Sequence, residues 1–217
     1  MKAKKIYWAL LLVFLIAAIW LQTTGALGEA FWGIYGIIIA GFFVGGVFVN
    51  RQYLQDLEKE IKDMNPLMEQ EPDKYIEAME KALQGQKSRA MQAMLLIQIG
   101  KGYMAKGDYE TAKNRLLTVP PKGLNPVMAQ EYYITLGLTL FHLDKDEAAR
   151  KLLVLKVKDF DRARQNPELA HFYHILQILA MISEANRTGA RKYLAEHPEL
   201  EEREDCKKEM SFIHQKL

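Results

Sequence analysis

The chain of 217 residues has little of what a disulfide-stapled or strand-rich protein needs. Its single cysteine, Cys206, excludes an internal disulfide framework. After residue 50, no run shows the alternating Val, Ile and Thr pattern that is typical of strands. Helix-forming segments are instead interrupted by X-Pro pairs, in which the residue before proline disfavours helical backbone. The pairs are Asn65-Pro66, Glu71-Pro72, Pro120-Pro121, Asn125-Pro126, Asn166-Pro167 and His197-Pro198. The sequence therefore predicts an all-α fold.

Motifs for chemistry are also scarce. Gly102 and Gly107 have the spacing of a phosphate-binding loop, but Asp108 and Tyr109 occupy the positions where such a loop needs Lys and Ser or Thr. The net charge is only +2, which gives no reason to expect nucleic acid as a partner. These absences argue against an enzyme and against a bound cofactor.

One group of possible metal ligands lies within a single helical segment. Glu168, His171 and His174 share a helix face at three-residue spacing. Two histidines and one carboxylate without a second cluster of ligands are thin evidence for a metal site, and histidines that pack in the core or lie on the surface are the more common case. We therefore predict no metal site from the sequence.

Charge is absent from two long apolar runs near the N-terminus, residues 6–22 and 31–49, and Glu29 is the only charged residue between them. Each run is close to the ~20 apolar residues that a helix needs to cross ~30 Å of hydrocarbon. This pattern predicts a transmembrane helical hairpin over residues 1–50. For the first run a cleaved signal peptide is the alternative, because a lysine-rich start and small residues near Ala26 also fit one.

Positive charge flanks the two runs and is absent from the loop between them. The flanking cations are Lys2, Lys4 and Lys5 before the first run, and Arg51, Lys59 and Lys62 after the second. Because cytoplasmic flanks carry an excess of Lys and Arg, this predicts a two-span integral membrane protein with both termini in the cytoplasm.

Small residues recur along the second run: Gly36 and Ala40 lie one turn apart, and Gly41 and Gly45 form a second pair at the same spacing. Such spacing allows the backbone of another helix to approach closely. Packing against the first run through Ala17 and Ala18 is one interpretation. The other is a helix from a partner, or from a second copy of the chain in a homo-oligomer.

The remaining sequence divides into a connecting helix over residues 51–69 and an internally repetitive segment over residues 70–196. Ala78, Ala112, Ala149 and Ala190 recur at intervals of 34, 37 and 41 residues. The two clearest units read Leu96-x-x-Ile99-Gly100-x-x-Tyr103 before Ala112-x-x-x-Leu116, and Tyr133-x-x-Leu136-Gly137-x-x-Leu140 before Ala149-x-x-x-Leu153. In the first of these units, Gly107 can adopt a positive φ in the turn between the two predicted helices, and Asp108 can cap the second helix.

These residues resemble the tetratricopeptide repeat, a helix–turn–helix unit of about 34 residues. The match is closest over residues 93–119 and 130–156. The intervals are longer than in the family, the unit with Ala190 lacks the glycine, and no unit has the family's tryptophan. The resemblance implies antiparallel helix pairs that approach most closely at the small residues.

In this family, the first helices of the pairs line a concave groove that holds a peptide or helix of a partner protein. Counted from the glycines, the resemblance places Ile97, Lys101, Met104, Ile134, Leu138, Phe141, Ile175 and Leu179 there, together with Met94, Glu131, Phe172 and Ile182. Such an apolar lining favours an apolar or amphipathic helix as ligand. An open groove requires Ile134, Leu138 and Phe141 to be partly exposed. The alternative is that the chain's own helices bury this lining.

Residues 197–217 have the pattern of one last helix. Its acidic residues come first and its lysines later, which suits the helix dipole. Cys206, Met210, Ile213 and Leu217 fall on one stripe at helical spacing. We expect this helix to cap the last repeat.

The sequence as a whole predicts a membrane-anchored protein-interaction module, an adaptor or scaffold that presents a helical-repeat surface to protein partners. The alternative is an accessory or regulatory subunit of a membrane complex, docked through its Gly-rich transmembrane helix.

Overall fold

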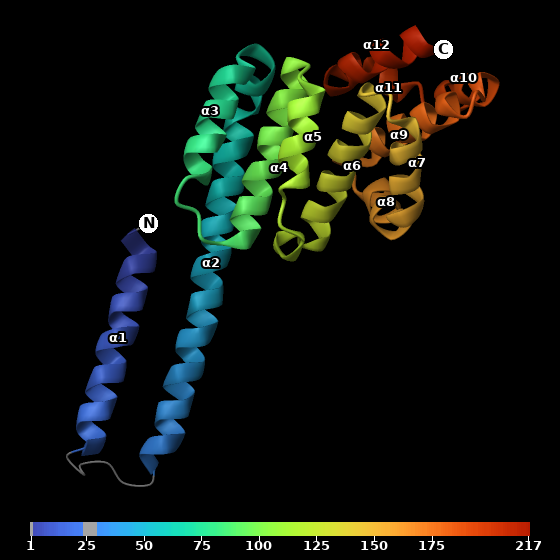
Figure 1. Ribbon diagram of the computed structural model, residues 1–217. Helices are drawn as coiled ribbons and strands as arrows, with labels where there is room; N and C mark the ends of the chain where they lie inside the picture. Colours follow the sequence, from blue (N-terminus) through green and yellow to red (C-terminus); the bar gives the residue numbers. More distant parts are fainter. Residues whose placement is uncertain (1, 24–29) are drawn as a thin grey trace. The chain divides into compact units, whose positions relative to one another are not determined.

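The computed structural model describes residues 2–23 and 30–217 of the chain (Figure 1). Within these ranges it contains helices and no strands, which confirms the all-α prediction. The chain divides into two compact units, Met1–Met64 and Asn65–Leu217.

Unit 1 consists of α1 (Lys2–Thr23) and the first part of α2 (Ala30–Gln70). Tyr7 on α1 donates a hydrogen bond from its hydroxyl to the carbonyl oxygen of Phe42 on α2. The Tyr7 and Phe42 rings meet edge to face with centroids 6.0 Å apart, and Phe14 lies 5.4 Å from Phe42. The two helices of unit 1 therefore contact each other through aromatic side chains.

The predicted membrane hairpin is contradicted by the helices themselves. In the part of the chain that the structure describes, no helix has both the length and the apolar character needed to cross a membrane. Neither apolar run forms a helix of its own, because residues 6–22 share α1 with the N-terminal lysines and residues 31–49 share α2 with a charged continuation. The prediction of two spans with both termini in the cytoplasm is therefore wrong. Ala26 and Glu29 of the predicted loop lie outside the described residues.

The small residues of α2 have two different environments. A Cβ atom added to Gly36 or Gly41 meets no described atom within 4 Å, and Ala40 is exposed. A Cβ on Gly45 would lie 3.7 Å from the Tyr7 ring. Packing against the first run is thus observed at Gly45, whereas α1 does not cover Gly36, Ala40 or Gly41, so the packing of these three residues against another helix stays a prediction.

The predicted connecting helix over residues 51–69 is the second half of α2, so the chain passes from unit 1 into unit 2 within one helix. The boundary expected at Asn65-Pro66 is wrong, since Pro66 lies inside α2. Both Asn65 and Pro66 are exposed, where water is available to replace the backbone hydrogen bond that proline cannot donate.

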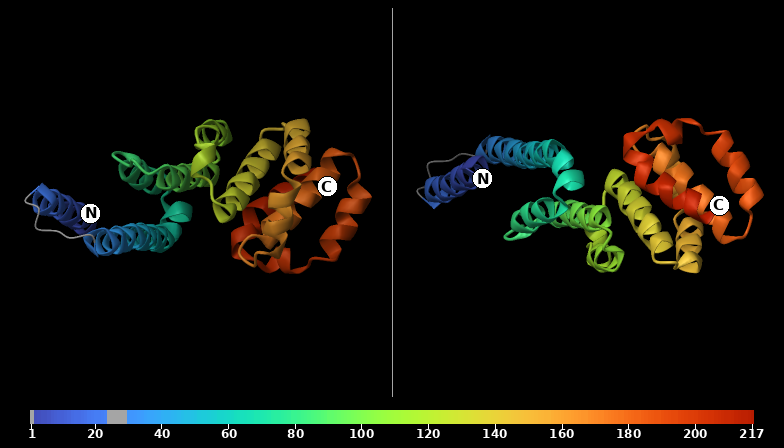
Figure 2. Two further views of the ribbon diagram at one scale, coloured as in Figure 1. Left: turned by 90° about the horizontal axis from the view of Figure 1, so that it is seen from below. Right: turned by 90° about the horizontal axis from the view of Figure 1, so that it is seen from above.

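Unit 2 continues with twelve short helical elements in the described chain (Figures 1 and 2). They are α3 (Pro72–Leu83), α4 (Arg89–Lys106), α5 (Tyr109–Leu117), η1 (Pro121–Gly123), α6 (Pro126–His142), α7 (Asp146–Leu155), α8 (Val157–Gln165), α9 (Ala170–Ser183), α10 (Arg187–Ala195), α11 (Glu199–Glu202) and η2 (Glu204–Cys206), followed by α12 (Lys207–Lys216). Neighbouring helices pack in pairs, α4 with α5, α6 with α7 and α9 with α10. The core of unit 2 lies between these pairs.

Turn and cap residues explain where the helices of the pairs begin. Gly107 ends α4 with a φ of 85°, and the Asp108 carboxylate accepts a hydrogen bond from the Thr111 amide at 3.1 Å to cap α5. Both roles were predicted. Asn125 caps α6 by accepting from the amides of Val127 and Met128, each at 2.9 Å. At these helix starts, short polar side chains therefore accept hydrogen bonds from backbone amides that have no partner within the helix.

The repeated alanines lie at close helix contacts. Ala112, Ala149 and Ala190 are completely buried, whereas Ala78 is half-buried. A Cβ on Gly100 would lie 2.8 Å from Leu116 of α5, the second helix of the same pair. A Cβ on Gly137 would lie 3.1 Å from Leu176 of α9. The absence of a side chain at Gly137 thus allows the next helix pair to approach α6, as well as the second helix of its own pair.

The longest interval between the repeated alanines contains an additional helix. Between α7 and α9 the chain forms α8, which buries Phe160 and Ala163 against its neighbours. α8 packs on α6 and α9. The stretched spacing to Ala190 therefore comes from an inserted helix with its own apolar face.

The single last helix expected over residues 197–217 is wrong, because α11, η2 and α12 replace it. Arg203 has an extended backbone, with φ −81° and ψ 124°, and breaks the helix. Leu200 and Cys206 are both fully buried, yet six residues along one helix would point their side chains about 120° apart around the helix axis. The break at Arg203 lets both side chains enter the core. Met210 and Ile213 of the predicted stripe are buried, and α12 packs on α9.

A larger side chain in place of Ala149 is expected to overpack the contact between α6 and α7. Ala149→Leu is expected to lower the free energy of unfolding by about 1–3 kcal/mol, because the larger side chain forces α6 and α7 apart. Ala148→Leu, at the exposed neighbouring position, is the matched control and should stay within about 0.5 kcal/mol of the unchanged protein. Chemical denaturation measures both values. Equal effects of the two substitutions would contradict the close contact at Ala149.

Candidate functional site: a cavity among the helices of unit 2

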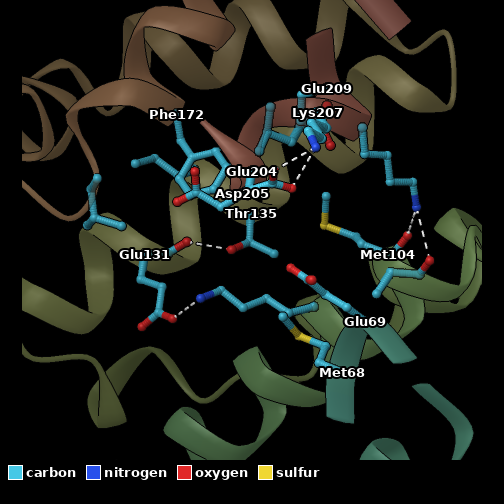
Figure 3. Close-up of a pocket in the computed structure, with 16 residues that line it drawn as sticks. Met68, Glu69, Met104, Glu131, Thr135, Phe172, Glu204, Asp205, Lys207 and Glu209 are labelled. Atoms are coloured by element: carbon cyan, nitrogen blue, oxygen red, sulfur yellow. Dashed lines mark hydrogen bonds and ion pairs between the residues drawn. The ribbon is translucent and has the colours of Figure 1, made fainter. Parts of the chain in front are cut away.

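Unit 2 contains a cavity of about 460 Å³, which we call the central cavity (Figure 3). The end of α2, α4, α6, the start of α9 and residues 204–209 line it. Its apolar lining consists of Met68, Met104, Ile134, Leu138, Leu169 and Phe172. The volume lies in the ~300–1,000 Å³ range of ligand pockets, so the central cavity can hold a small molecule or a few side chains.

The central cavity coincides with part of the predicted groove. Lys101, Met104, Ile134 and Leu138 line it, as do Glu131 and Phe172. Ile97, Phe141, Ile175 and Leu179 are instead buried in the helix core. The predicted groove is therefore wrong for these four residues, which the chain's own helices bury.

The requirement for an open groove is also not met. Ile134, Leu138 and Phe141 are only 2%, 4% and 2% exposed. The C-terminal residues 204–209 form one wall of the central cavity, so the chain itself covers much of this apolar surface.

A buried polar network supports the wall formed by α4 and α6. The Tyr75 hydroxyl donates to Gln98 Oε1 at 3.1 Å, and Gln98 Nε2 donates to Glu131 Oε1 at 2.9 Å. Lys101 forms an ion pair with the same carboxylate. Burial would raise the pKa of Glu131, but the Lys101 ammonium and the Gln98 amide together hold this pKa below its ordinary value. Burial, reinforced by the charge of Glu131, raises the pKa of Tyr75.

A second polar cluster fixes the opposite wall. His142 Nε2 lies 2.8 Å from Glu209 Oε2, and both side chains are buried. The His142 ring stacks between Tyr109 at 4.1 Å and Phe212 at 4.0 Å. Burial raises the pKa of Tyr109 to about 12, and the charge of Glu209 acts in the same direction. These contacts hold α12 against α5 and α6.

Lys208 ties the C-terminal wall to α4. Its ammonium donates to the carbonyl oxygens of Met104 and Ala105 near the end of α4, at 3.1 Å for Ala105, and lies 5.2 Å from the centre of the Tyr109 ring. Burial lowers the pKa of Lys208, although Glu209 opposes this effect. A lysine bound to helix-end carbonyls also offsets the helix dipole.

Acidic groups outnumber basic groups around the central cavity. The carboxylates of the lining are Glu69, Glu131, Glu204, Asp205 and Glu209, and the ammonium groups are Lys101, Lys207 and Lys208. Lys101 is paired with Glu131, and Lys207 with Glu204 at 2.7 Å. The lining therefore carries a formal excess of two negative charges.

The metal ligands considered on sequence grounds do not come together. His174 Nδ1 lies 2.8 Å from the Tyr193 hydroxyl, and its ring stacks on His197 at 4.0 Å. Glu168 is exposed. His171 instead approaches Asp205 and Cys206, and within the described residues this is the group whose ligand atoms are close enough for a metal ion. Sequence reasoning missed it because 34 residues separate His171 from Asp205.

No protein-family model, curated protein or solved structure matches this chain. The resemblance to the tetratricopeptide repeat therefore stays a prediction.

Proposed function

We propose that unit 2 is a protein-interaction module that docks an amphipathic helix of a partner protein at the central cavity. The observation that carries this proposal is a 460 Å³ space with an apolar floor between helix pairs. A whole helix, about 10 Å across, exceeds this space. The cavity instead accepts large apolar side chains that project from one face of the helix, the usual anchors of helix-in-groove recognition.

Charge defines the other face of the ligand. Because the lining carries a formal excess of two negative charges, Lys or Arg residues beside the apolar anchors complement it. Glu69 and Glu204 are exposed and accessible to such cations. The ligand that fits best is therefore a helix with an apolar stripe flanked by basic residues.

This proposal is tested with synthetic helical peptides and the full-length chain. A labelled peptide with leucines at positions i, i+4 and i+7 and flanking lysines should bind saturably, and a scrambled peptide should not. Glu69→Lys should weaken binding about three-fold at low salt, in keeping with the modest energy of an exposed ion pair. Glu77→Lys makes the same charge change at an exposed position of α3 outside the cavity and should have no effect. No saturable binding, or equal weakening by both variants, would rule out docking at the cavity.

A second candidate function rests on the uncovered small-residue face of α2. The open space at Gly36 and Gly41 permits close approach by a helix of another protein, which would make the chain an accessory or regulatory subunit of a complex. Gly41→Leu in the full chain separates the two functions. It should block assembly through α2 and leave peptide binding at the central cavity unchanged.

A further inference from the structure

Three side chains with metal-binding atoms meet where α9 begins and η2 ends. His171 lies in the first turn of α9, and Asp205 and Cys206 lie in η2. One ligand atom from each lies within 4.8 Å of the others. His171 and Cys206 are buried, while the Asp205 side chain is 44% exposed and lines the central cavity.

The environment of the His171 side chain is an independent indication that this group of residues binds a ligand. Its side chain is only 6% exposed, and neither ring nitrogen has a hydrogen-bond partner within the described residues. Nε2 lies 3.2 Å from Asp205 Oδ2, but not in hydrogen-bonding geometry. A buried polar group without a hydrogen bond is costly, and coordination of an ion by the ring nitrogen removes that cost.

We propose that His171, Asp205 and Cys206 bind a divalent transition-metal ion, with Zn²⁺ as the best match. A set of one imidazole nitrogen, one thiolate sulfur and one carboxylate oxygen suits zinc, whereas Ca²⁺ and Mg²⁺ prefer oxygen ligands alone. Binding forms a metal–sulfur bond and breaks the S–H bond of Cys206, whose proton passes to solvent. Small movements of the side chains bring the three donors to the ~2.0–2.3 Å distances that zinc requires.

The surroundings of the three ligands fit this assignment. Arg203 donates from Nε and Nη2 to the two oxygens of Asp205 at 2.9 and 2.7 Å, which fixes the orientation of the carboxylate. Oδ2 keeps a lone pair for the ion, whereas Oδ1 also accepts a hydrogen bond from the Cys206 thiol at 3.6 Å, a bond that is lost when the thiol gives up its proton. Such partners of metal ligands commonly orient them. Asp205 and Phe172 both line the central cavity, so the ion can enter from the cavity (Figure 3).

A bound ion would connect two segments that are distant in sequence. It joins the C-terminal residues that wall the cavity to the start of α9. Three protein ligands leave the fourth tetrahedral position for water. The ion therefore acts as a clip that holds η2 closed over the core and presents an open coordination position near the cavity.

Titration of the metal-free full-length protein with Zn²⁺, followed by calorimetry, tests the proposal. One ion per chain is expected, and each of Cys206→Ser, His171→Gln and Asp205→Asn should weaken binding at least ten-fold. His174→Gln removes a histidine one turn further along the same helix and should leave the affinity unchanged. Absence of binding to the unchanged protein overturns the proposal. So does an equal loss in the His174 variant, which would favour the ligands Glu168, His171 and His174.

Cobalt provides a measurement that does not depend on affinity alone. Co²⁺ bound to a thiolate gives a sulfur-to-metal charge-transfer band, which should appear with the unchanged protein and vanish in Cys206→Ser. Because Asp205 is exposed, Asp205→Asn is expected to keep the fold, and its far-ultraviolet circular dichroism checks this. Zn²⁺ should raise the melting temperature of the unchanged protein and not that of a folded Asp205→Asn variant. An equal rise in both, or a cobalt spectrum without the band, overturns the assignment.

Discussion

Glu209→Ala is expected to lower the free energy of unfolding of unit 2 by about 3 kcal/mol, because it leaves a buried histidine without its partner. His142 and Glu209 are only 5% and 8% exposed, and 2.8 Å separates the two polar atoms. The His142 ring is enclosed by Tyr109 and Phe212, so water cannot readily replace the lost carboxylate. Loss of this contact also loosens α12, which forms part of the cavity wall. Urea denaturation of the full chain, followed by circular dichroism, measures the change.

An exposed ion pair on the same segment serves as the control. Lys207 and Glu204 lie 2.7 Å apart with side chains that are 64% and 83% exposed. Glu204→Ala should therefore change stability by only about 0–1 kcal/mol. If Glu204→Ala and Glu209→Ala destabilise the protein equally, the buried contact between α12 and α6 does not contribute as the structure indicates.

Leu138→Glu is expected to unfold unit 2 or to destabilise it by more than about 4 kcal/mol. Leu138 is almost completely buried and belongs to the core cluster that contains Ile134, Phe141 and Ala149. A glutamate at this position places a carboxylate among the apolar side chains of this cluster, and the free-energy cost of removing that charge from water is large. Loss of helical circular dichroism and of a cooperative melt is the expected result.

The matched substitution at the same position is Leu138→Met. It nearly conserves volume and apolar character and should cost less than about 1.5 kcal/mol. If Leu138→Glu keeps the melting temperature of the Met variant, Leu138 is accessible to water, and the groove on this side of α6 is open after all.

Local chemistry accounts for the part of the fold that the sequence predicted correctly. Proline begins α3 at Pro72 and α6 at Pro126, and Gly107 with Asp108 sets the turn between α4 and α5. These signals act within a few residues and depend little on the rest of the chain. The break at Arg203 has a different origin, since it arises because Leu200 and Cys206 are both buried by distant helices.

For the candidate sites as well, the sequence predicted only those positions that depend on local structure. Counting from the repeated glycines found Lys101, Met104, Ile134 and Leu138 at the central cavity, because these positions depend only on helix periodicity. It failed for Ile175 and Leu179, which lie beneath the C-terminal helices. The group of His171, Asp205 and Cys206 has no local pattern, since it forms only when η2 folds back on α9.

The apolar N-terminal runs were misinterpreted for a related reason. The prediction treated residues 6–22 and 31–49 as two separate helices, whereas the helices of the structure extend beyond both apolar runs. Where a helix begins and ends depends on its caps and neighbours as well as on its apolar centre.

Site-specific photo-crosslinking in cells that make the protein tests the docking of a partner helix at the central cavity most directly. A photoactivatable residue at Met104 places the reactive group in the cavity, and one at Val154, which is exposed on α7 outside the cavity, is the control. The proposal predicts a crosslinked protein from Met104 that is absent from Val154, with the crosslink in an amphipathic segment rich in Lys or Arg. No crosslink from Met104, or the same products from both positions, would contradict it.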